Sequence, residues 1–171
     1  MNDREFQALL ERSHLLDGLD PLSRTALCMH FRPAHFGPGE LLLQTGSAGD
    51  RMFLLLQGEA RVRLPTEHGP VDLGLFGPDS FIGEVAFFGQ DETRTADVVA
   101  SSEIHAAQLT RETYDQMLRV DPGAAETLEK LVLDLMLERV AATNARMVEL
   151  VAAQGDDGTF RAAARMLARD L

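Results

Sequence analysis

The residues best suited to chemistry lie in one stretch, residues 80–96, which reads SFIGEVAFFGQDETRTA. It places a glycine and a carboxylate, Gly83 and Glu84, at one end of an apolar turn, and an arginine and a hydroxyl, Arg94 and Thr95, at the other. Arginine is a forked donor to phosphate oxygens, N–H groups at the start of a helical turn favour an anion, and a carboxylate accepts from a ribose hydroxyl. The stretch suits a sugar phosphate, although a surface ion pair between Glu84 and Arg94 fits the spacing equally well.

Length and charge limit the classes of protein to which the chain can belong. Its 171 residues, 45% hydrophobic and 25% charged, are enough for one globular domain with perhaps one appended element. The net charge of −11 argues against a general attraction to nucleic acid or to an anionic membrane. The basic residues are dispersed, and all except Lys130 are arginine.

Cysteine usage and hydropathy bear on the compartment. The single cysteine, Cys28, excludes an internal disulfide and fits a reducing environment. No stretch approaches the roughly 20 apolar residues that cross a bilayer, and the N-terminus lacks the features of a signal peptide. We therefore expect a cytoplasmic protein that makes no membrane contact.

The elements that must position residues 80–96 begin with two short helices. Apolar residues recur at near-helical spacing over residues 4–16, and Gly18 ends this helix. Asp20 followed by Pro21 is a typical helix start, which predicts a second helix through about His30. Pro33 closes the second helix.

The pattern then changes to a period of two, with turn residues every few positions. Glu59 to Leu64 is the clearest case, with small or apolar residues alternating with charged ones. Short strands at such spacing predict an antiparallel barrel or sandwich. The predicted strands cover residues 41–44, 52–56, 60–64, 71–76, 97–100 and 104–109.

The C-terminal third is predicted to be helical. Thr110 caps a short helix, and Asp121 with Pro122 caps a long one through about residue 154. Along the long helix, seven-residue spacing produces a stripe of residues, which suggests a parallel two-helix seam with a second copy; a helix lying back on its own domain stays the alternative. A glycine-rich break at 155–158 precedes a short helix over 159–171. The stripe consists of Leu133, Val140 and Met147 with the rows Met136, Thr143, Leu150 and Leu137, Asn144, Val151.

This order of elements resembles the cyclic nucleotide-binding domain, the module of catabolite activator proteins, cyclic-nucleotide-dependent kinases and cyclic-nucleotide-gated channels. The resemblance covers about residues 5–154 and is most specific at FIGEVAFF, residues 81–88, followed by RTA, residues 94–96, which is similar to the family's phosphate-binding cassette. It implies an α+β fold, an antiparallel, jelly-roll-like β-roll flanked by short N-terminal helices and a long C-terminal helix. Residues 1–154 would form the domain, including the long helix 122–154, and residues 155–171 a helical tail.

The resemblance also implies roles for individual residues of the cassette. Glu84 would accept from the ribose 2′-hydroxyl, and Arg94 would pair with the cyclic phosphate. Thr95 would bond a phosphate oxygen or the base edge. Backbone N–H groups near Gly83, Val85 and Ala96 would complete the cradle. The ligand would be cyclic AMP (cAMP) or cyclic GMP (cGMP), with no further cofactor.

The purine would lie against apolar residues of the roll and under the long helix. Strand alternation suggests Val62, Leu73 and Phe76 for the floor. In the family the long helix caps the base with polar side chains, which makes Arg139, Thr143 and Asn144 candidates; seam or surface positions are an equally good interpretation of these three.

The sequence departs from the bacterial regulators of this family at its C-terminal end. Those regulators continue into a winged helix-turn-helix of some 60–80 residues, whereas this chain stops at Leu171. We therefore expect no specific DNA binding by this chain. A homodimeric sensor that signals to a partner protein is the leading hypothesis; a dimeric scaffold that has lost nucleotide binding, or a fragment of a transcription regulator, is the alternative.

Metal and enzyme chemistry have weaker support in the sequence. Cys28, His30 and His35 lie close together but lack a second pair at a zinc-like spacing, so no metal site is predicted. No nucleophile or acid–base signature is present, and phosphate hydrolysis usually needs metal ions and a carboxylate–histidine cluster that the Glu84 stretch does not offer. We expect a binding protein and no enzyme.

Overall fold

The computed structural model describes residues 3–89 and 93–153. The chain divides into two compact units, residues 1–129 and residues 130–171, and each is described by itself. The first unit holds the helices and strands around the cassette. The second holds most of the long C-terminal helix; the predicted tail helix, residues 159–171, lies outside the described residues.

Two α-helices and a short 3-10 turn open the fold. Helix α1 spans Asp3–Glu11, the 3-10 turn η1 His14–Leu16, and α2 Pro21–Cys28. The prediction of Asp20 as a cap is confirmed, because its carboxylate accepts from the N–H groups of Leu22 and Ser23.

The prediction of one helix over residues 4–16 is wrong, because α1 ends at Glu11. The Ser13 hydroxyl donates to Asp79 Oδ1 at 2.6 Å, and the His14 N–H donates to the same oxygen at 3.0 Å. These bonds to a distant loop hold Ser13 in an extended conformation, so the helix cannot continue through it.

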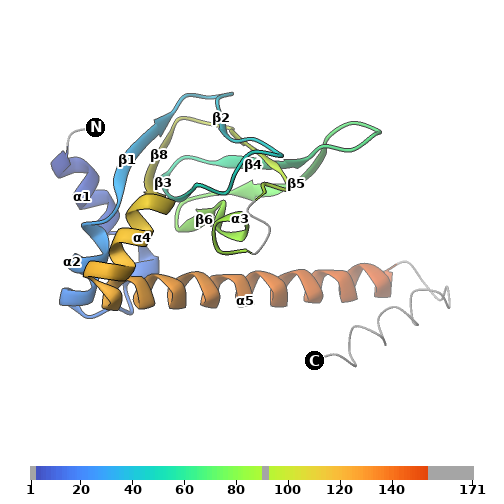
Figure 1. Ribbon diagram of the computed structural model, residues 1–171. Coiled ribbons are helices and arrows are strands. Elements are labelled where there is room, and N and C mark those ends of the chain that lie inside the picture. Colours follow the sequence, from blue (N-terminus) through green and yellow to red (C-terminus); the bar gives the residue numbers. More distant parts are fainter. Residues whose placement is uncertain (1–2, 90–92, 154–171) are drawn as a thin grey trace. The chain divides into compact units, whose positions relative to one another are not determined.

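In the described part of the chain, the strands form two antiparallel four-stranded sheets. Figure 1 shows how they are arranged. One sheet has the order β1-β8-β3-β6 and the other β2-β7-β4-β5. The predicted α+β fold with a β-roll and a long C-terminal helix is confirmed. The strands are β1 (Arg32–Phe36), β2 (Leu41–Leu43), β3 (Arg51–Gln57), β4 (Ala60–Leu64), β5 (Val71–Phe76), β6 (Ser80–Ile82), β7 (Asp97–Ala100) and β8 (Ile104–Thr110).

Two of these strands, β1 and β6, were not predicted. Strand β1 contains Pro33, which removes one N–H, and it is tolerated because β1 is an edge strand paired only with β8. Strand β6 is three residues long and lies at the opposite edge, where it pairs with β3. Its three residues lead directly into the cassette, and a strand this short has too few residues to show an alternating pattern in the sequence.

The core lies between the two sheets. It joins Phe53, Leu55 and Ile104 of the first sheet to Leu43 and Val98 of the second, and all five side chains are buried. Strand β3 is buried at five consecutive residues, Met52 to Leu56, so both of its faces are covered. This packed roll gives the cassette a rigid support.

Two helices follow the roll, α4 (Arg111–Val120) and α5 (Pro122–Ala153). Thr110 caps α4 as predicted, since its hydroxyl accepts from the Thr113 N–H at 3.2 Å. Asp121 Oδ1 accepts from the Ala124 N–H at 3.2 Å at the start of α5. Among the described residues, no helix is long and apolar enough to cross a membrane.

Candidate ligand-binding site

The cassette begins where β6 turns into a short helix, α3 (Glu84–Phe88). Gly83 stands at this turn with a φ of 87°, in the left-handed region that favours glycine. A Cβ atom at Gly83 would lie 2.4 Å from Arg94 Nη1 and 2.7 Å from Leu43 Cδ1. The glycine is therefore required both by the backbone conformation and by the close approach of Arg94.

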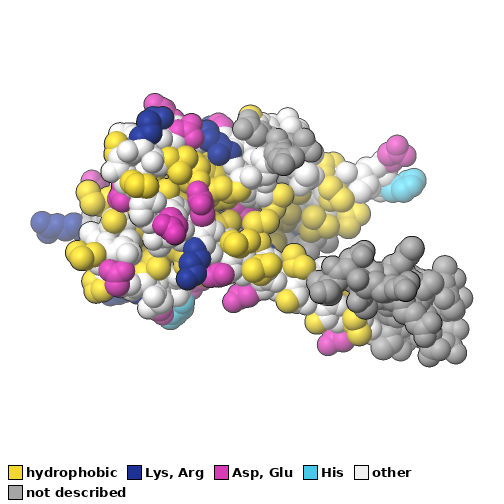
Figure 2. Space-filling view, turned by 60° about the horizontal axis from the view of Figure 1, so that its bottom comes forward, with side chains coloured by type: hydrophobic (Ala, Val, Ile, Leu, Met, Phe, Trp, Pro, Cys, Tyr) yellow, Lys and Arg dark blue, Asp and Glu magenta, His cyan; other side chains and the backbone are white. Residues whose placement is uncertain are grey.

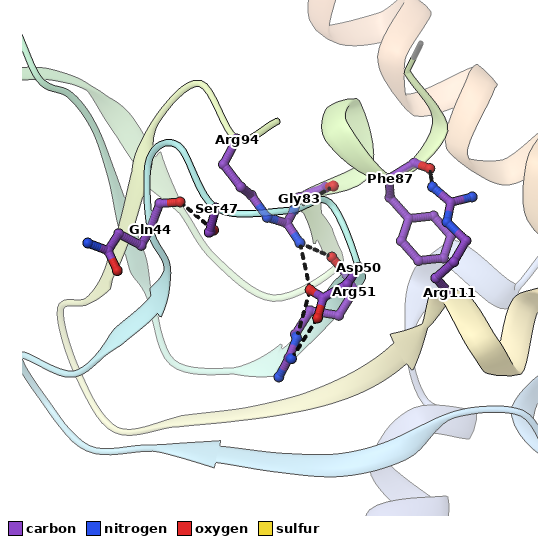
Figure 3. Close-up of polar contacts among 8 residues, drawn as sticks. All are labelled: Gln44, Ser47, Asp50, Arg51, Gly83, Phe87, Arg94 and Arg111. Carbon is purple, nitrogen blue, oxygen red and sulfur yellow. Dashed lines mark hydrogen bonds and ion pairs between the residues drawn. The ribbon is translucent and has the colours of Figure 1, made fainter. Parts of the chain in front are cut away.

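Arg94 turns inward from the chain just before β7, and only 4% of the residue is exposed. Its Nη1 donates to the Gly83 carbonyl at 2.9 Å, and its Nη2 donates to the Arg51 carbonyl (Figure 3). Its Nη2 also lies 3.9 Å from Asp50 Oδ1. Its Nε is buried and has no hydrogen-bond partner among the described residues. One guanidinium thus joins the start of α3 to the start of β3, and its buried Nε has no acceptor within the part of the chain that the structure describes.

Charged neighbours act on the Arg94 guanidinium. Burial lowers the pKa of Arg94, while the carboxylates of Asp50 and Glu84 raise it and so oppose that effect. The pKa of Asp50 is lowered, chiefly by its hydrogen bond to Arg51. Arginine titrates so far above neutral pH that Arg94 stays a cation here.

The remaining cassette residues differ in exposure. Glu84, the first residue of α3, is 5% exposed and lies close enough to Arg94 to influence its pKa. Val85 and Thr95 are exposed, and Ala96 is half-buried. The structure therefore brings the buried Glu84 and Arg94 together with the half-buried Gly83, and Thr95, which follows Arg94 in sequence, is exposed.

A hollow of about 320 Å³ opens beside Arg94, at the low end of the roughly 300–1,000 Å³ of small-molecule sites. Much of its wall comes from the loop between β2 and β3, which was predicted only as a turn. The two glycines in TGSAGD, residues 45–50, were the only feature of the sequence that could have indicated the close approach of this loop to the cassette. The hollow is lined by Leu41, Leu42, Leu43, Gln44, Ser47, Ala48, Asp50, Arg51 and Arg94.

Backbone bonds hold this loop against the end of the cassette. The Gly46 N–H donates to the Arg94 carbonyl, and the Arg94 N–H donates to the Ser47 carbonyl, both at 2.9 Å. The Ser47 hydroxyl donates to the Gln44 carbonyl at 2.6 Å, which tightens the turn (Figure 3). The loop and the segment around Arg94 therefore form one wall.

The loop also approaches α3 closely. A Cβ atom at Gly49 would lie 2.2 Å from the Ala86 carbonyl oxygen. Since a side chain of any kind at Gly49 would push α3 away, the glycine sets the distance between the loop and the cassette helix.

Arg111, the first residue of α4, fastens the other end of α3. Its Nη2 donates to the Phe87 carbonyl, and its guanidinium lies 4.3 Å from the centre of the Phe87 ring (Figure 3). Tyr114, one turn further along α4, packs edge-on against Phe87 and donates its hydroxyl to Glu129 of α5. Helix α3 is thus attached to α4, and α4 to the start of α5.

The residues expected to hold a purine lie in different environments. Val62 and Phe76 are half-buried and pack against the core between the sheets. Leu73 is 56% exposed, next to the irregularity where β5 shifts its register against β4. Arg139, Thr143 and Asn144 belong to the second unit, so their role as a lid stays a prediction.

A family model for the cyclic nucleotide-binding domain matches residues 33–121, just over half of the chain. The chain belongs to this family. The match includes β1 except for its first residue, strands β2 to β8, the cassette and α4, so the predicted resemblance is confirmed.

Individual relatives agree with this assignment. The chain is 24% identical over 144 residues to a CRP-like cAMP-activated global transcriptional regulator of Mycobacterium tuberculosis, covering 84% of this chain and 62% of the relative. It is 31% identical over 115 residues to a cAMP-dependent protein kinase regulatory subunit of Aspergillus fumigatus, covering 67% of this chain and 27% of the relative. The chain thus spans less than two thirds of either relative.

A solved structure supports the fold. The cyclic nucleotide-binding domain from Methylobacillus flagellatus superposes with a TM-score of 0.72 at 23% identity, covering 85% of this chain and 82% of that one. At this identity the similarity speaks for the architecture, which is the β-roll with helices described above.

Proposed function

We propose that this chain is a cytoplasmic sensor that binds a cyclic nucleotide at the hollow beside Arg94. The observation that carries the proposal is the buried Arg94 guanidinium, whose Nε lacks an acceptor among the described residues. A cyclic phosphate supplies that acceptor and a compensating negative charge. The family assignment supports a cyclic nucleotide over other sugar phosphates.

Each candidate residue takes one part of the ligand. Arg94 pairs with the phosphate, and Glu84 accepts from the ribose 2′-hydroxyl. Thr95 bonds a phosphate oxygen or the base edge, and the N–H groups near Gly83, Val85 and Ala96 complete the cradle. The purine packs against apolar residues of the roll, for which the candidates are Val62, Leu73 and Phe76. The long helix covers it, and the candidates there are Arg139, Thr143 and Asn144.

The test is a calorimetric titration with cAMP, cGMP and a cyclic dinucleotide. The names of both relatives carry cAMP, so cAMP is the first ligand to titrate. Arg94→Leu should remove a charge-assisted contact of about 2–3 kcal/mol, which lowers affinity by roughly two decades.

Arg119→Leu is the matched control, because Arg119 is an exposed arginine on α4. Arg119→Leu should bind the cyclic nucleotide as the wild type does. Circular dichroism of both variants checks that the roll is intact. Unchanged affinity in a folded Arg94→Leu protein would show that Arg94 does not bind the ligand.

A second candidate function is a scaffold that no longer binds nucleotide. One observation favours it: two donors of Arg94 already serve the carbonyls of Gly83 and Arg51 within the domain. Under this alternative no ligand of the panel raises the melting temperature, and Arg94→Leu lowers the melting temperature without any ligand present.

We propose that the output is a change in a homodimer read by a partner protein. The seven-residue stripe of α5 supplies the seam, and a ligand drives the change only through its different affinities for the two arrangements. We propose no enzymatic step. Incubation with cAMP should leave the cyclic nucleotide intact, and release of linear nucleotide would contradict this.

A further inference from the structure

Three side chains that can bind a metal meet at the end of the β1–β8 pair, apart from the hollow beside Arg94. His35 of β1 and His105 of β8 are direct cross-strand partners, and Glu103 precedes His105 by two residues. Direct partners share a face of the sheet, so the register places the two imidazoles on one face (Figure 1 shows the two strands). Glu103 lies in the turn directly before β8, and its carboxylate reaches both imidazoles.

The distances among these groups suit one small ion. His35 Nε2 lies 2.9 Å from Glu103 Oε1, and His105 Nε2 lies 4.0 Å from the same oxygen. The ligand atoms of all three lie within 4.8 Å of one another. Two ligands about 2.0–2.1 Å from one tetrahedral ion are about 3.3 Å apart. The side chains of His35 and Glu103 are more than half exposed, which leaves room for the small adjustment of their ligand atoms.

The backbone beneath Glu103 is held firmly. Gly58, at a φ of 83°, packs so closely that a Cβ atom there would lie 2.1 Å from the Glu103 carbonyl oxygen. The Ser102 hydroxyl accepts from the Glu59 N–H at 3.0 Å.

The surroundings leave room for an ion and a further ligand. Glu103 and His105 line a hollow between α1 and the sheet, together with Glu5, Arg12 and Gln57. Gln57 is the register partner of His105 on β3, so its amide lies on the same face. This wall supplies a route of entry and oxygen atoms for a fourth position.

We propose that His35, Glu103 and His105 form a binding site for a divalent transition-metal ion, with Zn²⁺ as the ion that suits it best. Two imidazoles and one carboxylate match the nitrogen and oxygen ligands of zinc sites that keep a fourth position open. Calcium and magnesium prefer oxygen ligands throughout and fit this set poorly. The ion joins the edge strand β1 to β8 and to the turn before it. No metal site was predicted from the sequence, because the residues near His35 lack a second pair at a zinc-like spacing. The pairing of His35 with His105 across two strands could not be seen from the sequence.

The experiment is a calorimetric titration of the tag-free full chain, stripped with EDTA, against ZnCl₂. We expect one ion per chain and a higher melting temperature with zinc, because an ion that binds only the folded state stabilises it. Loss of an outer partner of a metal ligand already costs about 10–100-fold in affinity. His35→Ala and Glu103→Gln should therefore bind zinc at least about 100-fold more weakly.

His68→Ala is the matched control, since His68 is an exposed histidine in the β4–β5 turn. It should bind zinc as the wild type does. His35 and Glu103 are exposed, so their variants keep the fold, which circular dichroism verifies. Absence of zinc binding by the wild type, or binding that persists in His35→Ala and Glu103→Gln, overturns the proposal.

Discussion

Arg94 and Gly83 depend on each other at the scale of single residues. The guanidinium of Arg94 occupies the space where a Cβ atom of residue 83 would be, and it bonds the carbonyl of that residue. The glycine therefore does two things: it permits the turn before α3, and it lets the cation approach the backbone. Substitution of Gly83 affects both the turn and the approach of Arg94. Comparison with substitution of a glycine that only permits a turn separates the two effects.

Gly83→Ala should destabilise the domain and weaken nucleotide binding. The left-handed conformation costs a non-glycine residue about 1–2 kcal/mol, and displacement of Arg94 adds to that cost. Urea unfolding measures the first effect and titration with cAMP the second.

Gly39→Ala is its control, because Gly39 has a φ of 84° and nothing within 4 Å of its added Cβ. It should lose about the same backbone energy and keep its affinity for the ligand. Equal loss of affinity in both variants would show that the position of Arg94 is unimportant.

The elements divide into those that the sequence specifies locally and those that depend on partners. Strands β4, β5 and β7 have the predicted bounds, because alternation and flanking glycines are local signals. Strand β1 was missed because Pro33 usually marks the end of a helix or strand. Proline is tolerated here because β1 is an edge strand, which the sequence does not reveal. The wall at residues 44–50 was missed for a similar reason: its bonds to Arg94 join segments that are distant in sequence.

The candidate site was predictable in its residue types but not in its geometry. Glu84 and Arg94 could be named from the sequence, and the structure buries both. That Arg94 bonds the carbonyls of Arg51 and Gly83 could not be foreseen, because backbone carbonyls carry no sequence signal.

The N-cap of α4 gives a prediction at the scale of elements. Thr110→Ala should lower the free energy of unfolding by about 1 kcal/mol, because the Thr113 N–H loses its acceptor. Chemical denaturation followed by circular dichroism measures it. Thr110→Ser keeps the hydroxyl and removes only the methyl group, so it should retain most of the stability; an equal loss in the serine variant would assign the effect to packing.

At the scale of the whole molecule, the seven-residue repeat along α5 bears on whether the protein forms a dimer. Leu133, Val140 and Met147 recur every seven residues, and each is about half exposed. Such a repeat suits a two-stranded coiled coil, in which each of these side chains fits between residues of the facing helix.

The proposed dimer should depend on this stripe. In sedimentation experiments the wild type should be a dimer at micromolar concentration, and Leu133→Glu with Val140→Glu should shift it to monomer, because buried like charges face each other across the seam. Ala142→Glu, on the opposite side of the helix at 100° per residue, should leave the dimer intact. A monomeric wild type would contradict the prediction.

The attachment of Arg111 to the Phe87 carbonyl has a mechanical consequence. Whatever displaces α3 carries that carbonyl with it, so Arg111 must follow or lose a charge-assisted bond and a ring contact. Coupling of this kind acts equally in both directions. If the proposed function holds, a protein that bound α4 would therefore change the nucleotide affinity through Arg111, without contacting the ligand.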